Sequence, residues 1–524
     1  MTGPWCHRQR ATTTRRAHVP RRRCLAATVA ADVLVHGGTS AVDFSSSRVL
    51  NDHVTLVLGI DSSTQSTKAV LVDADDGTLV AARTAPHPPG TEVDPRAWLD
   101  AVDTATAGLL ERAAAVSVAG QQHGMVALDV HGTPVRDALL WNDTRSAGAA
   151  RDLVAEMGGP QACADAVGSV LVASFTATKL RWLRDHEPEH ASEVAEVLLP
   201  HDFVSRHLGA PGTDAFTDRS DASGTGYFDT AHGVWRPDLA ESALGRAFGL
   251  PRLVAPGAVA AHTPGDAVVA GGTGDNAGAA LGMALQPGDV LVSVGTSGVA
   301  SGVSTRCVAD GTGTITGFAD AVGGFLPLIA TMNAAGILDL QARWLGVDHD
   351  GLAELALQSG PGAGGVTLVP YYGGERTPNR PRAVGTWTGL TPATTRADLA
   401  RAAYEALLCS LADAVDRLVA ETGEQPRRLF LVGGATRSAA LRALAPAVLG
   451  RRVTLPPPGE YVALGAARQA AWALSGAADP PEWPLPDTQV LEADPTPHVR
   501  EVYTDLVERT THWTRSATVT EGTT

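Results

Sequence analysis

Asp275 is the residue whose surroundings first suggest chemistry. It stands in the stretch GGTGDNAGAALG, residues 271–282, between a run of glycines and a segment made almost wholly of alanine and glycine. A carboxylate can act as a general base toward a hydroxyl group, and small neighbouring side chains would let a substrate approach closely. An aspartate at a helix start also accepts backbone N–H bonds and opposes the helix dipole. We expect a helix that begins at Asn276, and the local sequence leaves base and cap equally open.

Three turns rich in glycine and hydroxyl side chains point to an anion. They cover residues 61–67, 295–298 and 433–438, and each follows an apolar run. Backbone N–H groups in such turns can form an anion-binding nest. Taken singly, each is an ordinary turn, but three in one chain favour a phosphate site. The sequence contains no G-x-x-x-x-G-K-[ST], no G-x-G-x-x-G after a strand and no G-x-S-x-G, which disfavours P-loop, Rossmann and α/β-hydrolase proteins.

Basic residues set a further constraint on how a phosphate is held. Only two of the 41 basic residues are lysines, Lys68 and Lys179. A bound phosphate must therefore rely mostly on backbone amides, hydroxyls, arginine or a metal ion.

The elements that must carry these turns alternate between strands and helices. Residues 54–83 predict a strand, turn, strand, turn, strand meander, and residues 288–303 repeat its strand and hydroxyl-turn unit. The repeat suggests two homologous halves facing each other. Residues 396–421 place apolar side chains on one helical stripe, and a buried strand, a double-glycine turn and a helix follow. This alternation predicts an α/β architecture.

Length and composition limit the classes of protein. A chain of 524 residues is too long for one ordinary core, so we expect two domains. The net charge of −15 disfavours nucleic acid or an anionic membrane as partner. The five cysteines show neither zinc-site nor disulfide spacing, which favours a reducing cytoplasm.

The segment 1–53 differs from the rest of the chain. It holds eight arginines and three aspartates, and Asp32 interrupts its one apolar stretch. We interpret it as a disordered or mis-assigned extension, with an export signal as the minority alternative. The predicted divisions are an N-terminal domain at 54–284, a C-terminal domain at 285–480 and a tail with one helix at 481–524.

A series of motifs resembles the FGGY carbohydrate kinases, a family of the actin-like ATPase superfamily. The resemblance covers about residues 54 to 475, and its motifs stand in the family's order: AGQQHGMVALD (119–129), LLWNDTR (139–145), KLRWLRDHEPE (179–189), LLPHDF (198–203), TDRSDASGT (217–225), GGTGDNAGAALG, SVGTSGV (293–299), YYGGERTPNRP (371–381) and LVGGATRS (431–438). The resemblance implies two actin-like, ribonuclease H-like α/β domains with a catalytic cleft between them.

The resemblance also implies roles for residues that match the family's motifs. Asp275 matches the catalytic base. The matches for sugar binding are Gln122, His123, Asp275 and Asn276, and Trp141, Asp143 and Arg145 either line the same cleft or have structural roles. The matches for ATP and its phosphates are Asp61, Ser63, Thr64 and Thr67 in a first hairpin, Gly295, Thr296 and Ser297 in a second, and Gly433, Gly434 and Ser438 in an adenosine loop. Asp61 is expected to hold Mg²⁺ through water.

The chain departs from the family's pattern at a few of these positions. Serine replaces a common glycine at Ser63 and Ser66, and Ala435 replaces the third glycine of the adenosine loop. Gln122 stands where relatives can have methionine, which places the sugar preference in question.

The implied activity is transfer of the γ-phosphoryl group of ATP, with Mg²⁺, to the C5 hydroxyl of D-xylulose. Other acceptors within the family, such as ribulose or gluconate, are the nearest alternatives, and a non-catalytic actin-like nucleotide-binding protein is a more distant one. The expected partners are ATP and a small sugar, in the cytoplasm, without nucleic acid or membrane. The resemblance is compatible with a homodimer.

Overall fold

A computed structural model describes residues 54–514, which belong to one compact unit. The extension predicted at 1–53 and the end of the tail, from 515 on, lie outside the described residues. Within 54–514, every helix is too short or too polar to span a membrane.

The first half of the chain builds a seven-stranded sheet. Its strands run in the order β13-β14-β5-β1-β2-β3, with β15 also paired to β5. Their bounds are β1 Leu56–Ser62, β2 Ser66–Asp73, β3 Leu79–Pro86, β5 Ala115–Gly120, β13 Val259–His262, β14 Val268–Ala270 and β15 Thr273–Gly274. β1, β2 and β3 form the predicted antiparallel meander, whereas β5 is parallel to β1. Nearly all of β1 is buried, as its continuous apolar run indicates for a strand covered on both faces.

The second half builds an equivalent sheet, in the order β18-β19-β17-β16-β22-β23-β24. The strands are β16 Asp289–Val294, β17 Gly298–Gly302, β18 Thr316–Ala319, β19 Phe325–Thr331, β22 Arg428–Val432, β23 Val453–Leu455 and β24 Gln489–Leu491. β16 pairs antiparallel with β17 and parallel with β22, as β1 pairs with β2 and β5. The predicted duplication is confirmed at the level of strand order and direction.

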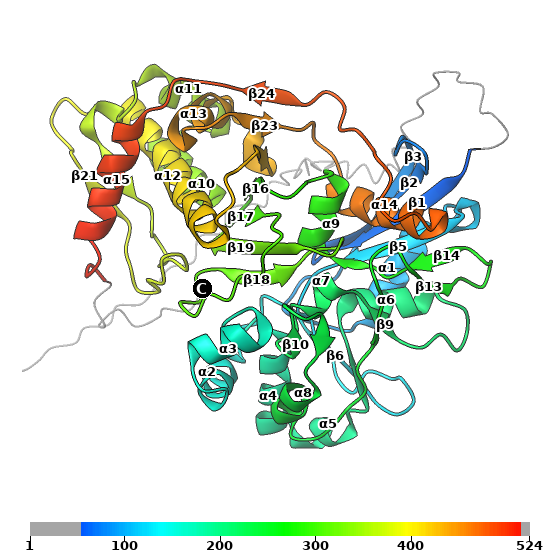
Figure 1. Ribbon diagram of the computed structural model, residues 1–524. Helices are drawn as coiled ribbons and strands as arrows, with labels where there is room; N and C mark the ends of the chain where they lie inside the picture. Colours follow the sequence, from blue (N-terminus) through cyan, green and yellow to red (C-terminus); the bar gives the residue numbers. More distant parts are fainter. Residues whose placement is uncertain (1–53, 515–524) are drawn as a thin grey trace, which may run out of the picture. The chain divides into compact units, whose positions relative to one another are not determined.

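Helices cover both sheets (Figure 1). The helix predicted at 396–421 is α12, Arg396–Thr422, which begins at a capping box formed by Thr395 and Asp398. It is central to the largest apolar core, together with α10 Ala335–Leu345, α11 His349–Gln358 and α13 Ala439–Leu449. The predicted tail helix is α15, Pro497–Arg509.

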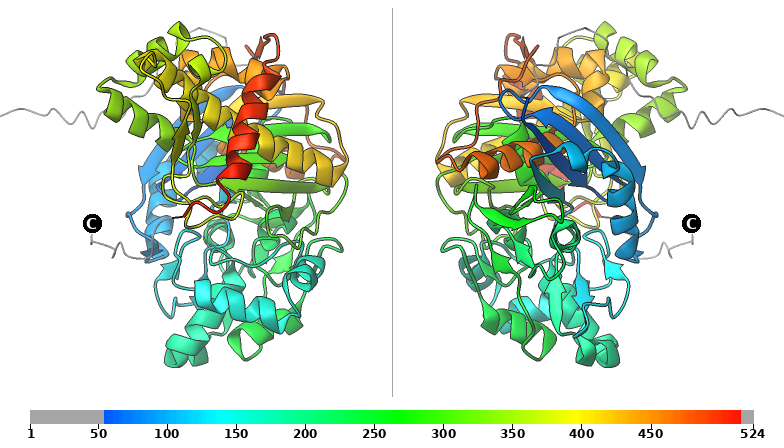
Figure 2. Two further views of the ribbon diagram at one scale, coloured as in Figure 1. Left: turned by 90° about the vertical axis from the view of Figure 1, so that its left-hand side faces the viewer. Right: turned by 90° about the vertical axis from the view of Figure 1, so that its right-hand side faces the viewer.

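The first half carries its own set of helices: α1 Arg96–Thr106, α2 Ala147–Glu156, α3 Pro160–Val167, α4 Thr176–His186, α5 Pro188–Glu193, α6 Pro200–Leu208, α7 Arg219–Ala222 and α8 Pro237–Leu244. α4 contacts α2, α5 and α8, and α2 contacts α3. These helices belong to the cyan and green part of the chain at the bottom of both views in Figure 2. The short strands are β4 Glu92–Val93, β6 Val126–Leu128, β7 Ala138–Leu139, β8 Glu196–Leu198, β9 Phe216–Thr217, β10 Phe228–Asp229, β11 Val234–Trp235, β12 Arg252–Leu253, β20 Thr367–Val369 and β21 Thr386–Thr388; three 3₁₀ turns cover Leu110–Arg112, Ala363–Gly365 and Gly434–Arg437.

Two helices cross between the sheets, α9 (Asp275–Gly282) and α14 (Tyr461–Ser475). Their backbones touch, because a Cβ atom on Gly282 would lie 2.0 Å from the carbonyl oxygen of Tyr461, and one on Gly465 would lie 1.9 Å from that of Gly278. α14 packs on the first sheet, and α9 packs on the second. Each helix thus covers the sheet of the other half. The predicted domain boundary between residues 284 and 285 therefore separates α9 and α14 from the sheets on which they pack.

Candidate active site

A cleft of about 970 Å³ is lined by residues of both halves. From the first half it takes the end of β1, the start of α9 and Lys68 of β2. From the second half it takes the end of β22, the turn after it and the loop that leads into α14. The predicted site residues that line it are Asp61, Ser63, Asp275, Asn276, Gly433 and Gly434.

Asp275 is the first residue of α9, and Gly274 is the N-cap. The helix therefore begins one residue earlier than predicted, and Asp275 is not its cap. Its Oδ1 accepts hydrogen bonds from the backbone N–H of Asn276 at 2.7 Å and from Asn276 Nδ2 at 2.9 Å. Burial, and then the charge of Asp61, raise the pKa of Asp275 to about 7. A carboxyl group with a pKa near neutrality is suited to general base chemistry.

Asp61 is buried near the end of β1 and lines the same cleft. Ser63 Oγ donates a hydrogen bond to Asp61 Oδ1 at 2.5 Å. Burial raises the pKa of Asp61 to about 6, although the Ser63 bond and Lys68 lower it. Two carboxylates therefore share this part of the cleft.

Gln122 joins the start of α9 to the loop after β5. Its Oε1 accepts a hydrogen bond from Asn276 Nδ2 at 3.2 Å, and its Nε2 donates one to the carbonyl oxygen of Ser220 at 3.2 Å. Gln122 does not itself line the cleft, but it contacts a residue that does. The structure thus brings Gln122, Asn276 and Asp275 together, and their role in sugar binding stays a prediction.

His123 follows in a left-handed backbone conformation, with φ of 71°. A strained non-glycine residue of this kind is costly and often marks a functional site. Its Nδ1 lies 2.6 Å from the carbonyl oxygen of Gly224, so Nδ1 carries the proton and Nε2 is free to accept a hydrogen bond. The rings of Phe175 and Phe318 lie 4.9 and 5.5 Å from the His123 ring, and burial lowers the pKa of His123 to about 4.

The remaining residues of the first turn are occupied within the first half. Thr64 Oγ1 accepts a hydrogen bond from Trp141 Nε1 at 2.9 Å. Thr67 is fully buried, and its hydroxyl lies 2.8 Å from His87 Nε2. Asp143 binds Arg145 and Thr91, and like Trp141 and Arg145 it is absent from the cleft lining. The structure therefore gives Thr67 and Asp143 structural contacts rather than a place on the cleft wall.

The second turn, between β16 and β17, presents a different surface. Its residues Thr296 and Ser297 are exposed, and the N–H of Gly295 bonds to the carbonyl oxygen of Ser297 at 3.1 Å. Neither side chain lines the cleft. The hydrogen bond that closes the turn is made by backbone groups.

The double-glycine turn after β22 requires glycine at Gly433. This residue has φ of 100°, and a Cβ atom on it would lie 2.5 Å from the carbonyl oxygen of Val294. A Cβ atom on Gly434, by contrast, would meet nothing within 4 Å. Ser438 does not line the cleft, because its hydroxyl caps α13 by accepting from the N–H of Leu441 at 3.4 Å and also bonds Tyr404 at 2.8 Å.

Sequence reasoning missed an ion pair that crosses between the two halves. Lys68 Nζ lies 2.5 Å from Glu460 Oε2, and both residues line the cleft. Their separation in the chain left no local signal. Arg437 and the proline-rich loop 456–458 also line the cleft. Arg437 could have been expected there because it continues the double-glycine motif, and the loop because a Pro-Gly turn follows a short strand.

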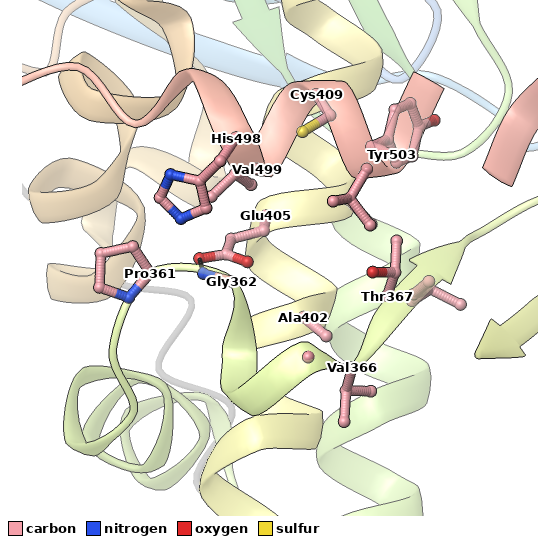
Figure 3. A pocket seen from close by; sticks show the side chains of 14 residues that line it. Pro361, Gly362, Val366, Thr367, Ala402, Glu405, Cys409, His498, Val499 and Tyr503 are labelled. Atoms are coloured by element: carbon pink, nitrogen blue, oxygen red, sulfur yellow. Dashed lines mark hydrogen bonds between the residues drawn. The ribbon is translucent and has the colours of Figure 1, made fainter. Parts of the chain in front are cut away.

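A second cavity, of about 260 Å³, lies between β20, α12 and α15 (Figure 3). Its carboxylate, Glu405, accepts hydrogen bonds from Arg401 Nε at 2.7 Å and from the N–H of Gly362 at 3.1 Å. Most of the other lining residues are apolar or glycine. Because the Glu405 carboxylate is already paired, this cavity is a weaker candidate for an active site than the cleft.

Comparisons with known proteins agree with the two-half architecture. Models of the FGGY family of carbohydrate kinases match the chain over residues 56–282 for the N-terminal domain and 290–474 for the C-terminal domain. Xylulose kinases of Streptomyces coelicolor and Streptomyces rubiginosus are 47% and 45% identical to this chain over 80% and 84% of it, and 88% and 92% of those proteins.

Solved structures give the same result. The xylulose kinase from Bifidobacterium adolescentis has 45% sequence identity and a TM-score of 0.81, covering 86% of this chain and 99% of that one. A glycerol kinase from Plasmodium falciparum, at 19% identity and a TM-score of 0.76, covers 87% of this chain and 98% of that one and shares the fold. The predicted two-domain actin-like fold is confirmed, and the chain belongs to the FGGY family of carbohydrate kinases.

Proposed function

We propose that this carbohydrate kinase transfers the γ-phosphoryl group of ATP to the C5 hydroxyl of D-xylulose, giving D-xylulose 5-phosphate and ADP. The observation that supports it most is Asp275, a carboxylate with a raised pKa at the start of α9, in a cleft shared by both halves. The relatives named above, which are xylulose kinases, support the choice of sugar.

Asp275 is the proposed general base. The C5 oxygen forms a bond to the γ-phosphorus while its proton passes to the Asp275 carboxylate, and the bond between the γ-phosphorus and the β–γ bridging oxygen breaks to release ADP. The positive dipole end at the start of α9 would stabilise negative charge on the phosphoryl group.

Gln122, His123 and Asn276 are the proposed sugar-binding residues; Asn276 lines the cleft next to this base, whereas Gln122 and His123 are absent from the cleft lining. Neutral His123 would accept a hydrogen bond from a sugar hydroxyl at Nε2, since its Nδ1 is taken by Gly224. Asn276 already binds both Gln122 and Asp275. A sugar that contacts Asn276 would therefore be aligned with the base.

The second half is proposed to hold the nucleotide. Gly433 and Gly434 allow a ligand to approach the backbone after β22. In the turn at Gly295, Thr296 and Ser297, the N–H of Gly295 is bonded within the turn, and the N–H groups of Thr296 and Ser297 are proposed to face the phosphates. Arg437 adds positive charge to the cleft wall, where the charge of Lys68 is paired with Glu460. Because ATP is an intracellular substrate, we expect the reaction to take place in the cytoplasm.

The residues of the cleft fit a magnesium ion. Mg²⁺ prefers oxygen ligands, and Asp61 and Asp275 place two carboxylates on the wall of one cleft, whose charge a divalent cation would neutralise. We propose that Asp61 holds Mg²⁺, through water. When bound, the ion would neutralise charge on the β- and γ-phosphates.

The test is ADP release with Mg-ATP and each of D-xylulose, L-xylulose, D-ribulose, L-ribulose, glycerol and gluconate, with the position of the phosphate on the product read by NMR. We expect turnover on D-xylulose above the others and phosphate on C5. A different preferred sugar would contradict the substrate and point to Gln122. An absence of sugar-dependent turnover would contradict the proposal and favour a non-catalytic actin-like protein, which nucleotide-dependent pelleting would detect.

A further inference from the structure

Four ionisable residues are buried next to the turn at residues 271–274 that leads into Asp275, and the proposed reaction uses none of them. They are His201 and Asp202 on α6, and Asp218 and Asp221 at the N-terminus of α7, each at most 4% exposed. Burying charge is costly unless it is paired and hydrogen-bonded. Such a cluster therefore calls for an account of what it does.

His201 is held between two carboxylates. Its Nδ1 lies 2.5 Å from Asp221 Oδ2, and its Nε2 lies 3.4 Å from Asp202 Oδ1. Although burial lowers the pKa of His201, Asp202 and Asp221 raise it to about 10, which favours the protonated ring. Asp221 Oδ2 accepts at Nδ1 and the carbonyl oxygen of Gly271 lies 3.3 Å from Nε2, so both ring nitrogens face acceptors; we call this buried group the His201 lock.

This lock touches the turn directly. A Cβ atom on Gly272, which has φ of 83°, would lie 2.3 Å from Cδ2 of the His201 ring. His201 Nε2 also lies 3.3 Å from the carbonyl oxygen of Gly271. The backbone that leads into Asp275 thus packs on the face of the buried histidine.

Ser220 links the cluster to both neighbours of Asp275. Its hydroxyl donates to Asp218 Oδ2 at 2.6 Å and accepts from the N–H of Gly274 at 3.1 Å. Its carbonyl oxygen accepts from Gln122 Nε2, and Gln122 in turn accepts from Asn276. Gly274 and Asn276 flank Asp275 in the chain, so two separate paths from Ser220 reach the residues on either side of it.

We propose that Ser220, fixed by Asp218 and by the buried pair of His201 and Asp221, is a positioning residue that sets the geometry of the Asp275 carboxylate. The inference rests on the proposed role of Asp275 as base. Because the Ser220 hydroxyl both donates and accepts a hydrogen bond, it fixes the position of the Gly274 backbone relative to Asp218. A base displaced by about 1 Å can lose about 100-fold in rate. Supporting residues around a catalytic group typically contribute about 10- to 100-fold.

The test is a double-mutant cycle of Ser220→Ala and Asp275→Asn in the full chain, measured by sugar-dependent ADP release. Ser220→Ala is expected to lower kcat about 10- to 100-fold while KM for ATP changes less than about twofold. In the Asp275→Asn background it is expected to cost less than about threefold more, because residues that act through one another are not additive.

Ser205→Ala is the matched control, because Ser205 is a buried serine on α6 whose hydroxyl has no hydrogen-bond partner among residues 54–514. We expect its kcat to stay within about twofold of the wild type. A kcat for Ser220→Ala equal to that of this control, or full additivity with Asp275→Asn, would overturn the inference. If Asp275→Asn itself retains wild-type turnover, the base assignment fails, which is a distinguishable result.

Asp221→Asn is a second variant that keeps the side-chain shape and covers the case in which Ser220→Ala does not fold. It weakens the bond to His201 from ionic to neutral, and we expect kcat to fall about threefold to tenfold with KM for ATP unchanged. Unchanged kcat in a folded Asp221→Asn protein would also contradict the positioning role.

Discussion

The two sheets place different kinds of groups at equivalent strand ends. Next to last in β1 stands Asp61, whereas the equivalent position of β16 is Ser293, and both line the cleft. After β5, which is parallel to β1, the chain continues with Gln121, Gln122 and His123; after β22, parallel to β16, it continues with Gly433 and Gly434.

The difference indicates that the two duplicated halves have different roles in the proposed reaction. The first half presents carboxylate, amide and imidazole groups, which can exchange protons and recognise hydroxyls. The end of β22 in the second half presents bare glycine backbone at Gly433 and Gly434, which suits close approach of a nucleotide and its phosphates. Substitutions in the first half are therefore expected to lower kcat, and those in the second to raise KM for ATP.

Asp61→Asn is expected to have the largest effect after loss of the base itself. Because Asp61 is the proposed Mg²⁺ holder through water, we expect kcat to fall about 100-fold. The matched change in the second sheet, Ser293→Ala, removes a neutral hydroxyl and is expected to cost about fivefold or less. Steady-state kinetics of both variants test the division, and equal losses would contradict it.

Gly433→Ala tests the backbone side of the comparison. The added Cβ atom meets the Val294 carbonyl oxygen in a strained conformation that costs about 1 to 3 kcal/mol. The turn must shift, so we expect KM for ATP to rise about tenfold with kcat little changed. Gly434→Ala, whose Cβ atom meets nothing, is the control, and an equal rise in KM there would show that strain at Gly433 is not the cause.

Serine-to-alanine changes in the two hairpin turns are expected to have smaller and unequal effects. Ser63 binds the Asp61 carboxylate, whereas Ser297 is exposed with its carbonyl alone engaged. We expect Ser63→Ala to lower kcat about fivefold and Ser297→Ala to change it less than about twofold. A larger loss at Ser297 would mean that the second turn also acts through side chains.

The pH dependence of stability gives the smallest signal, in the ligand-free protein. The pKa of Asp275 is raised from 3.8 to about 7, so its contribution to stability is present below pH 4 and is lost as the pH rises through 7. Asp275→Asn removes this loss. Thermal melts should show the Tm of the variant gaining on the wild type from pH 5 to pH 8, and a constant difference would contradict the raised pKa.

Much of the fold was readable because its signals are local. The meander at Leu56–Pro86 follows from apolar runs separated by turn residues, and α12 from one apolar stripe and a capping box. The motif series also placed Asp61, Asp275 and Gly433 at the cleft. The start of α9 was wrong by one residue, because Gly274 rather than Asp275 takes the cap.

The rest depended on contacts that sequence position does not reveal. Ser438 stands in a motif for nucleotide binding, yet its hydroxyl caps α13, and Thr67 turns its hydroxyl to His87. The ion pair of Lys68 with Glu460 joins opposite ends of the described chain. Local patterns give residue types, whereas the direction of a side chain is decided by tertiary packing.

Asp275→Asn is the most direct test of the account, measured as sugar-dependent ADP release with D-xylulose alongside the affinity for ATP by calorimetry. General base catalysis contributes about 10²- to 10⁴-fold, so we expect turnover to fall by at least about 100-fold while ATP affinity stays within about twofold. Asp152→Asn, an exposed carboxylate on α2, is the matched control and should keep wild-type turnover. Wild-type turnover in Asp275→Asn would contradict the account.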